Sequence, residues 1–334
     1  DVNNDKLLDL VSGSYWYEGP DYLKRHFITD FKRYDQYYDD FSTLPLDVNG
    51  DGLVDYITGG WFAKRLVWME NPGDTTPWKQ HLIAEAGNIE ATRMWDIDGD
   101  GVPEIVPNTP NDSLVIYRLT SDLQGGNIEE FEATPIYGKH NHGLGFGDIN
   151  GDGRGDFVLN KGWLEAPENP FKDKWLFHSG FDFGKASIPI LTVDINKDGF
   201  NDIIVGQAHD YGLHWYEQKR NKKGVISWEK HAIDPNNSQF HSMEWADLDG
   251  DGELEIVQAA FGGTRGSGSL HVLTADGMLA GDVLPYDLLV TAPTLVIDEN
   301  DGSRNVFFNE ITGSAGRVHR IDFSSNVFDE RTNW

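Results

Sequence analysis

An acidic nine-residue motif recurs along this chain at nearly regular intervals, and it limits the possible folds more than any other feature. Its pattern is Asp-x-Asn/Asp-x-Asp-Gly-x-x-Asp/Glu, and six copies begin at residues 1, 47, 96, 148, 194 and 247. A damaged seventh copy begins at Asp298. The unit of about 48 residues fills the chain, so no linker or second domain is needed. Such a period is typical of proteins built from repeated supersecondary units.

Each unit contains four short apolar or alternating segments. One precedes the motif, as at 188–193, and one follows it, as at 203–205. A third alternates aromatic side chains, as at 66–70, and a fourth resembles 78–83. Short alternating segments between Gly, Asn and Asp are typical of strands, and no helical period competes. Four strands in each of seven units predict an all-β fold, a seven-bladed β-propeller that forms a single domain over residues 1–334.

The start of the chain leaves the first strand of the first blade unassigned. Because Asp1 already lies within a motif copy, we expect the chain to be a processed or trimmed product. Either residues are missing before Asp1, or the tail 324–334 supplies that strand.

Composition excludes several classes of function. The chain has 27 Lys and Arg against 55 Asp and Glu, a net charge of −28. Nucleic acids and anionic membranes attract basic surfaces, so neither is expected as a partner. The absence of Cys rules out disulfides and thiolate metal sites. No signal peptide and no apolar run of about 18 residues occur, and nothing indicates an obligatory protein partner.

The acidic motif predicts structural Ca²⁺ sites. Alternate Asp and Asn side chains on a tight loop direct hard oxygen ligands to one point, and the Gly at the sixth place permits the turn. Without a cation, about 20 acids in six loops would repel one another, although an Asx-rich turn without metal is the alternative. The first copy departs from the pattern at Lys6. The predicted ligands are Asp1, Asn3, Asp5, Asp9, Asp47, Asn49, Asp51, Asp55, Asp96, Asp98, Asp100, Glu104, Asp148, Asn150, Asp152, Asp156, Asp194, Asn196, Asp198, Asp202, Asp247, Asp249, Asp251 and Glu255.

Most of the 11 histidines recur at one place of the repeat, which favours packing over chemistry. Four share a place in the fourth strand, and three share a place in the third. These seven are His26, His81, His178 and His231, then His214, His271 and His319. The remaining four, which the repeat does not explain, are His140, His142, His209 and His241.

Three of the unexplained histidines map to one rim of the predicted propeller, opposite the calcium loops. His142 and His241 open first strands, and His209 ends a second strand, on three neighbouring blades. Converging imidazoles with an open position suit Zn²⁺ or a similar divalent metal. The alternative is three separate rim histidines.

Other side chains predicted at this rim suit a carbohydrate. Aromatic faces can stack on a sugar ring while polar groups hydrogen-bond its hydroxyls, although blade packing is the alternative for each aromatic. Arg265, in a glycine-rich loop, could reach a carboxylate. The predicted catalytic residues are His140, His142, His209, Tyr211, His241 and Lys161, and the predicted substrate-binding residues are Arg93, Trp163, Gln207, Asp210, Trp61 and Arg265.

The motif and its flanks resemble the FG-GAP/VCBS repeat family over the full chain, which implies a Ca²⁺-bearing propeller. The segments HGLGFGDINGDG from His142, GWLEAP from Gly162 and GQAHDYGLHWYEQ from Gly206, together with Gln239-Phe240-His241, resemble the propeller of the aldos-2-ulose dehydratase group. That resemblance implies a metal-assisted lyase, which eliminates water from a keto-sugar such as 1,5-anhydrofructose or glucosone.

The residues suit such an elimination. A metal on His142, His209 and His241 would polarise the ketone. His140 or Asp210 would take the α-proton, and Tyr211 or Lys161 would protonate the leaving hydroxyl.

Two other readings stay open. A polysaccharide lyase, resembling ulvan lyases in broad terms, would use Arg93 or Arg265 to neutralise a uronic acid, His142 or His209 as base and Tyr211 as acid. A non-catalytic propeller would bind glycan or protein. Filled calcium loops favour a secreted or periplasmic location.

Overall fold

A computed structural model of the protein describes residues 1–35, 37–121, 127–247, 255–261, 268–273, 284–286, 294–297, 304–312 and 315–322. Every regular element in these residues is a β-strand, which confirms the predicted all-β fold. The chain divides into two compact units, residues 1–142 with 167–175 and residues 143–166 with 176–334.

The first unit contains two four-stranded sheets, one three-stranded sheet and a short hairpin. The three-stranded sheet comprises β1 (Leu10–Ser12), β2 (Tyr15–Tyr17) and β3 (Arg25–Phe27), and the hairpin comprises β4 (Arg33–Tyr34) and β5 (Tyr37–Tyr38). The four-stranded sheets comprise β6 (Leu44–Leu46), β7 (Asp55–Gly59), β8 (Arg65–Glu70) and β9 (Lys79–Glu85), then β10 (Ala91–Trp95), β11 (Glu104–Asn108), β12 (Ser113–Ser121) and β13 (Asn127–Lys139).

The second unit contains three four-stranded sheets and a three-stranded one. The first two comprise β14 (Leu144–Gly147), β15 (Asp156–Leu159), β16 (Gly162–Glu165) and β17 (Leu176–Ser179), then β18 (Leu191–Val193), β19 (Asp202–Gly206), β20 (Tyr211–Arg220) and β21 (Ile226–Ser238). The others comprise β22 (Ser242–Ala246), β23 (Glu255–Phe261), β24 (Gly268–Leu273) and β25 (Leu284–Tyr286), then β26 (Thr294–Ile297), β27 (Arg304–Thr312) and β28 (Ala315–Asp322).

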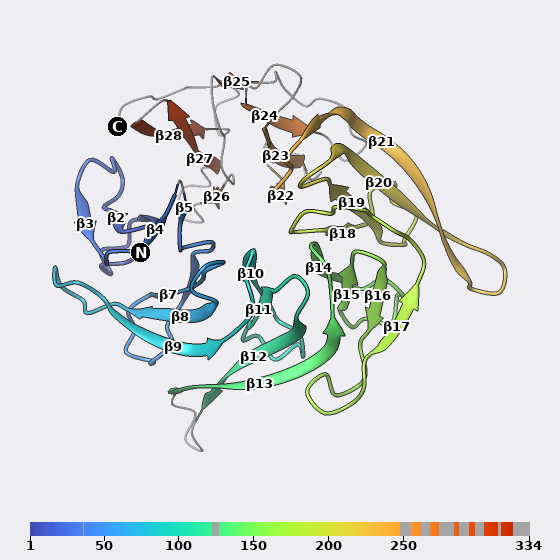
Figure 1. Ribbon diagram of the computed structural model, residues 1–334, viewed down its shortest axis with the longest axis horizontal. Helices are drawn as coiled ribbons and strands as arrows, with labels where there is room; N and C mark the ends of the chain where they lie inside the picture. The colour runs from blue at the N-terminus through green and yellow to red at the C-terminus, as the bar shows by residue number, and fades with distance from the viewer. Residues whose placement is uncertain are drawn as a thin grey trace. The chain divides into compact units, whose positions relative to one another are not determined.

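Successive strands pair antiparallel within each sheet, so each sheet is a meander in chain order (Figure 1). Five described sheets have the four strands that the repeat predicts, and these meanders are the blades of a β-propeller. The count of seven blades, their closure into one ring and a single domain over residues 1–334 stay predictions. The tail 324–334 and the damaged copy at Asp298 lie outside the described residues.

The hydrophobic core lies between successive sheets, as radial packing requires. In the first unit, Trp68 of β8 and Ile105 of β11 belong to one buried cluster. In the second unit, Leu213 of β20 and Met243 of β22 belong to another. β14 approaches the segment before β18 so closely that a Cβ on Gly145 would overlap the carbonyl oxygen of Ile190. Within each unit, these contacts pack neighbouring sheets on each other.

The motif loops at 47–55, 96–104, 148–156 and 194–202 each join the first and second strands of their sheet, whereas the loop 1–9 precedes β1. The loop 47–55 joins β6 to β7, and the loop 148–156 joins β14 to β15. The sixth place adopts a positive φ, 85° at Gly52 and 88° at Gly153, which glycine adopts without the steric cost that a side chain brings. Lys6 adopts a φ of 73° at the same place. The predicted role of the glycine is therefore confirmed.

We expect Lys6→Gly to raise the free energy of unfolding by about 1 kcal/mol, because it relieves a left-handed conformation that costs a side chain about 1–2 kcal/mol. The converse substitution, Gly52→Ala, should lower it by a similar amount, since an added Cβ meets nothing within 4 Å and only the φ opposes it. Urea unfolding of both variants measures the difference. A Lys6→Gly protein no more stable than the parent would contradict this account.

The four histidines assigned to the fourth strand form one repeated packing arrangement. Each ring stacks on a tryptophan of the neighbouring strand, with centroids 4.1 Å apart for Trp16–His26 and 4.2 Å apart for Trp68–His81. The distances are 4.3 Å for Trp163–His178 and 4.5 Å for Trp215–His231. Nε2 of each ring also contacts a glutamate, in the pairs Glu18–His26, Glu70–His81, Glu165–His178 and Glu217–His231. The predicted packing role is confirmed for these four.

Candidate functional site

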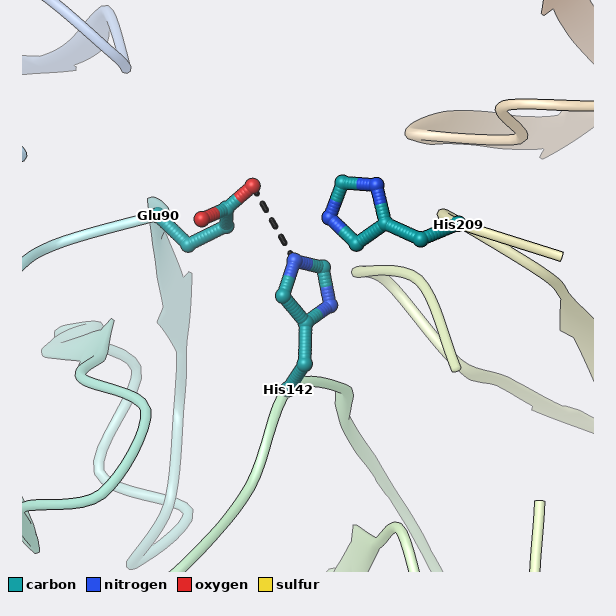
Figure 2. A group of neighbouring side chains, drawn as sticks. All are labelled: Glu90, His142 and His209. Atoms are coloured by element: carbon teal, nitrogen blue, oxygen red, sulfur yellow. Dashed lines mark ion pairs between the residues drawn. The ribbon is translucent and has the colours of Figure 1, made fainter. Parts of the chain in front are cut away.

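A carboxylate and an imidazole meet in the first unit. Oε1 of Glu90 lies 3.0 Å from Nε2 of His142, and both side chains are largely shielded, 17% and 16% exposed. Figure 2 shows the carboxylate facing the ring across this ion pair. Glu90 directly precedes β10, and its backbone N–H donates to the carbonyl of Asn108 at the end of β11. The sheet of β10–β13 therefore holds Glu90 at one end of its strands, and the motif loop 96–104 lies at the opposite end.

Two imidazoles meet in the second unit. The rings of His209 and His241 have centroids 5.0 Å apart, with planes inclined by 67°. Nε2 of His241 lies 3.1 Å from Oε1 of Gln239, and Gln239 adopts a φ of 60°, in the left-handed region. A non-glycine residue in this conformation is strained, and such strain is concentrated at functional sites.

All four residues lie at corresponding ends of strands. Glu90 precedes β10, His142 lies two residues before β14 and His241 precedes β22, while His209 follows β19. In an antiparallel pair, the start of the first strand lies beside the end of the second. The predicted proximity of His209 and His241 is therefore confirmed by their ring contact. Convergence of His142 with this pair stays a prediction.

His140 is buried and committed to local contacts. Its Nε2 lies 3.2 Å from Nδ2 of Asn108, and its Nδ1 lies 3.1 Å from the carbonyl oxygen of Asp112. Burial lowers the pKa of His140 to about 4, although Asp112 acts in the opposite direction, so the ring is neutral at pH 7. These contacts favour a packing role over the predicted catalytic one.

Two residues predicted to bind substrate are instead packed in the second unit. Trp163 is 5% exposed and stacks on His178, so its ring faces the core. Gln207 is 7% exposed; its Nε2 donates to the carbonyl of Phe183, and its Oε1 accepts from the N–H of Lys185. Trp163 packs on β17 of its own sheet, and Gln207 ties the segment 183–185 to the end of β19. These contacts favour a packing role over the predicted substrate-binding role.

The other predicted residues are more accessible. Tyr211 opens β20 and is 53% exposed, and its N–H donates to the carboxylate of Asp210. Nζ of Lys161 lies 3.6 Å from the carboxylate of Asp182, with both side chains exposed. Trp61 and Arg93 are partly buried, the latter within β10. Arg265 lies outside the described residues.

In the described motif loops, Asp and Asn oxygens accept backbone N–H groups of their own loop, and calcium binding there stays a prediction. In the loop 47–55, Asp47 accepts N–H groups from residues 50, 51 and 52, and Asn49 accepts that of Asp51. The loops 1–9, 148–156 and 194–202 use their first and third residues in the same way. In the loop 96–104, the ligand atoms of Asp96, Asp98 and Glu104 lie within 4.8 Å of one another. This donor set fits a calcium ion, although Asp249 and Asp251 lie outside the described residues.

The ninth residue of the motif has a structural role that the sequence interpretation missed. Asp55 is fully buried, and its two oxygens accept the N–H groups of Val48, 3.0 Å away, and Asn71, 2.7 Å away. Asp9, Asp156 and Asp202 each accept a corresponding pair of N–H groups. Burial raises the pKa of Asp55 to about 6 and that of Glu104 to about 7. This acid therefore ties the loop to the end of the third strand.

The sequence places Glu90 at this rim, but the predicted catalytic, substrate-binding and metal-binding residues do not include it. It lies six residues before Asp96, and His142 lies six residues before Asp148, so both occupy the same place of the repeat. This shared position indicates Glu90 from the sequence, but its contact with His142 is seen only in the structure.

Comparison with known proteins supports the fold. Residues 47–107 and 194–257 match the family of FG-GAP-like repeats. No curated protein matches the chain. In the described part of the chain, no helix has the length and apolar character of a membrane span.

Three solved structures are similar to this chain at low identity. The V. cholerae biofilm matrix protein Bap1 is 17% identical with a TM-score of 0.39, covering 87% of this chain and 52% of Bap1. BBS1N, solved in complex with ARL6DN and soaked with lead, is 12% identical with a TM-score of 0.49. The match covers 88% of this chain and 80% of BBS1N. The extracellular domain of the putative hybrid two component system BT4673 from B. thetaiotaomicron is 15% identical with a TM-score of 0.42. The match covers 89% of this chain and 36% of that one.

The chain thus spans about half the length of Bap1, and these similarities are too low to carry an argument about function. The chain carries FG-GAP-like repeats in two places, and its meandering antiparallel sheets are those of an FG-GAP-type β-propeller.

Proposed function

We propose that this protein is a metal-assisted lyase that eliminates water from a keto-sugar such as 1,5-anhydrofructose or glucosone. The observation that carries the proposal is the shielded Glu90–His142 pair, with 3.0 Å between Oε1 and Nε2. A carboxylate beside an imidazole, both largely removed from water, supplies the proton-transfer groups or metal ligands that an elimination requires. The repeat does not account for this pair as packing.

The available donors fit a borderline divalent metal such as Zn²⁺. We propose His142, His209 and His241 as its ligands, with Glu90 beside them, because imidazole and carboxylate are the ligands of catalytic zinc sites in a protein without cysteine. The ion, when bound, would act as a Lewis acid on the substrate ketone. The contact of His241 with Gln239 would orient its ring.

Proton transfer is assigned to residues of the chain. We propose Glu90 as the base that takes the proton from the carbon beside the ketone, in place of the packed His140. Tyr211 would give a proton to the leaving hydroxyl, since its phenol is exposed two residues after His209. Its chain neighbour Asp210 already accepts a hydrogen bond from the N–H of Tyr211.

A polysaccharide lyase is the second candidate. His209 and Tyr211 are both exposed and close in sequence, so they could serve as base and acid of a metal-free elimination from a uronic acid. In that case Arg93 would neutralise the substrate carboxylate. Calcium-filled loops would place either enzyme in the extracellular space or the periplasm, where calcium is plentiful.

Elemental analysis combined with assays tests these alternatives. Parent protein, His142→Ala, His209→Ala and Glu90→Gln are assayed on 1,5-anhydrofructose, glucosone and a uronan, following the absorbance of the conjugated product. We expect a bound transition metal and keto-sugar turnover in the parent, loss of metal and product in the histidine variants, and loss of product in Glu90→Gln. His178→Gln, which alters a packing histidine, should keep both.

Other outcomes separate the alternatives. Product from the uronan alone, without a transition metal, would support the second candidate. A parent with neither transition metal nor product on any substrate would overturn the lyase and leave a glycan- or protein-binding propeller.

A further inference from the structure

One of the four repeated Trp–His–Glu arrangements differs from the others in its charge. In each arrangement, a residue of the fourth strand lies directly opposite the glutamate. In two arrangements this residue is a lysine. Lys24 forms an ion pair with Glu18, and Nζ of Lys79 lies 3.6 Å from Oε2 of Glu70. Leu176 occupies this place opposite Glu165. Opposite Glu217 it is a second carboxylate, Glu229.

This second carboxylate is unfavourable unless a cation joins it. Like charges directly opposite each other on paired strands destabilise a sheet. Lys219 and the amide of Asn196 contact Oε1 of Glu217, which leaves Oε2 facing Nε2 of His231 at 3.0 Å. Lys219 pairs directly with Glu217 and also attracts the charge of Glu229, so one ammonium group offsets two carboxylates only in part.

We propose that Glu217, Glu229 and His231 bind a zinc-like divalent cation, a metal site separate from the proposed lyase centre. Their ligand atoms lie within 4.8 Å of one another. Ligands of a tetrahedral zinc ion lie about 3.4 Å apart, so the gap between Oε2 of Glu217 and Nε2 of His231 has to widen by only a few tenths of an ångström. Glu229 is exposed, so its side chain can turn toward the ion at little cost.

The ring geometry supports a distinct role for this arrangement. The His231 ring is inclined by 29° to the plane of Trp215, whereas the three other stacks are inclined by 10°, 11° and 15°. The three ligands come from β20 and β21, which extend over 10 and 13 residues. An ion here would therefore tie together the long β20–β21 hairpin.

Zinc titration by calorimetry tests the site, in millimolar calcium to fill the motif loops. A His209→Ala/His241→Ala background removes the proposed lyase ligands, so that failure of either proposal is seen separately. We expect one zinc ion per chain in this background, and binding weakened at least about tenfold by Glu229→Gln or His231→Gln. Glu70→Gln, the matched change in a sheet with Lys79, should leave zinc binding unchanged.

A second variant gives an independent readout. Glu229→Lys recreates the Glu70–Lys79 arrangement, so in zinc-free calcium buffer it should melt at a higher temperature than the background protein. Zinc should raise the melting temperature of the background protein and not that of Glu229→Lys. Zinc binding of equal strength in Glu229→Gln and the background protein would overturn the proposal.

Discussion

Chelation of calcium is expected to lower the melting temperature of this protein by on the order of 10 °C or more. Each ion bound at about 100 times its dissociation constant stabilises the folded state by about 2.7 kcal/mol, and several loops contribute. A change of 1 kcal/mol shifts the melting temperature of a large domain by about 2–4 °C. Loss of the ions also leaves the clustered acids, such as Asp96, Asp98 and Glu104, to repel one another.

Differential scanning calorimetry in calcium and in a calcium-selective chelator measures this shift. Magnesium should not restore the melting temperature, because it demands a smaller, octahedral site. Asp98→Ala should remove one calcium ion from the count, whereas Glu168→Gln, an exposed acid outside the loops, should remove none. Equal melting temperatures in calcium and in chelator would show that the loops are Asx-rich turns without metal.

The repeat made the strands and loops predictable. A feature that returns about every 48 residues is observed several times in one sequence, so chance apolar runs are averaged out. The same comparison separated packing histidines from the others. His81 and His178 recur in the fourth strand and stack on tryptophans, while His209 and His241 do not recur and contact each other.

The direction of individual side chains was harder to predict. Successive side chains of a strand point to opposite faces, so an error of one residue moves a ring from the rim to the core. Trp163 lies within β16 and is buried, and Gln207 follows β19 with its amide bonded to the segment before β18. His140 lies in an irregular segment, where no period indicates that both ring nitrogens are already bonded.

The role of the acid at the ninth place of the motif was difficult to predict for a chemical reason. A carboxylate that binds a metal and one that accepts two backbone N–H groups occur at the same place in the sequence. Burial separates them in the structure, since Asp55 is fully buried and Asp51 is exposed. The two roles predict different responses to calcium.

Asp55→Ala is expected to destabilise the first unit by about 4 kcal/mol, whether or not calcium is present. The substitution leaves the N–H groups of Val48 and Asn71 without their acceptor in a buried environment, and each such loss costs about 1–3 kcal/mol. Asn71 also donates its side-chain amide to the carbonyl of Val2, so the disturbance reaches the loop 1–9. Urea unfolding in calcium and in chelator measures the effect.

Asp51→Ala provides the matched control within the same loop. Its exposed carboxylate accepts only the N–H of Leu53 and the amide of Asn49 within the loop, so its main proposed role is calcium binding. The destabilisation caused by Asp51→Ala should therefore largely disappear in chelator, while that of Asp55→Ala persists. If both variants lose their effect when calcium is removed, then Asp55 acts chiefly as a metal ligand and its bonds to the loop and the third strand are secondary. Asp55→Asn separates the two roles further, because its amide keeps one acceptor oxygen and turns a donor toward the other N–H.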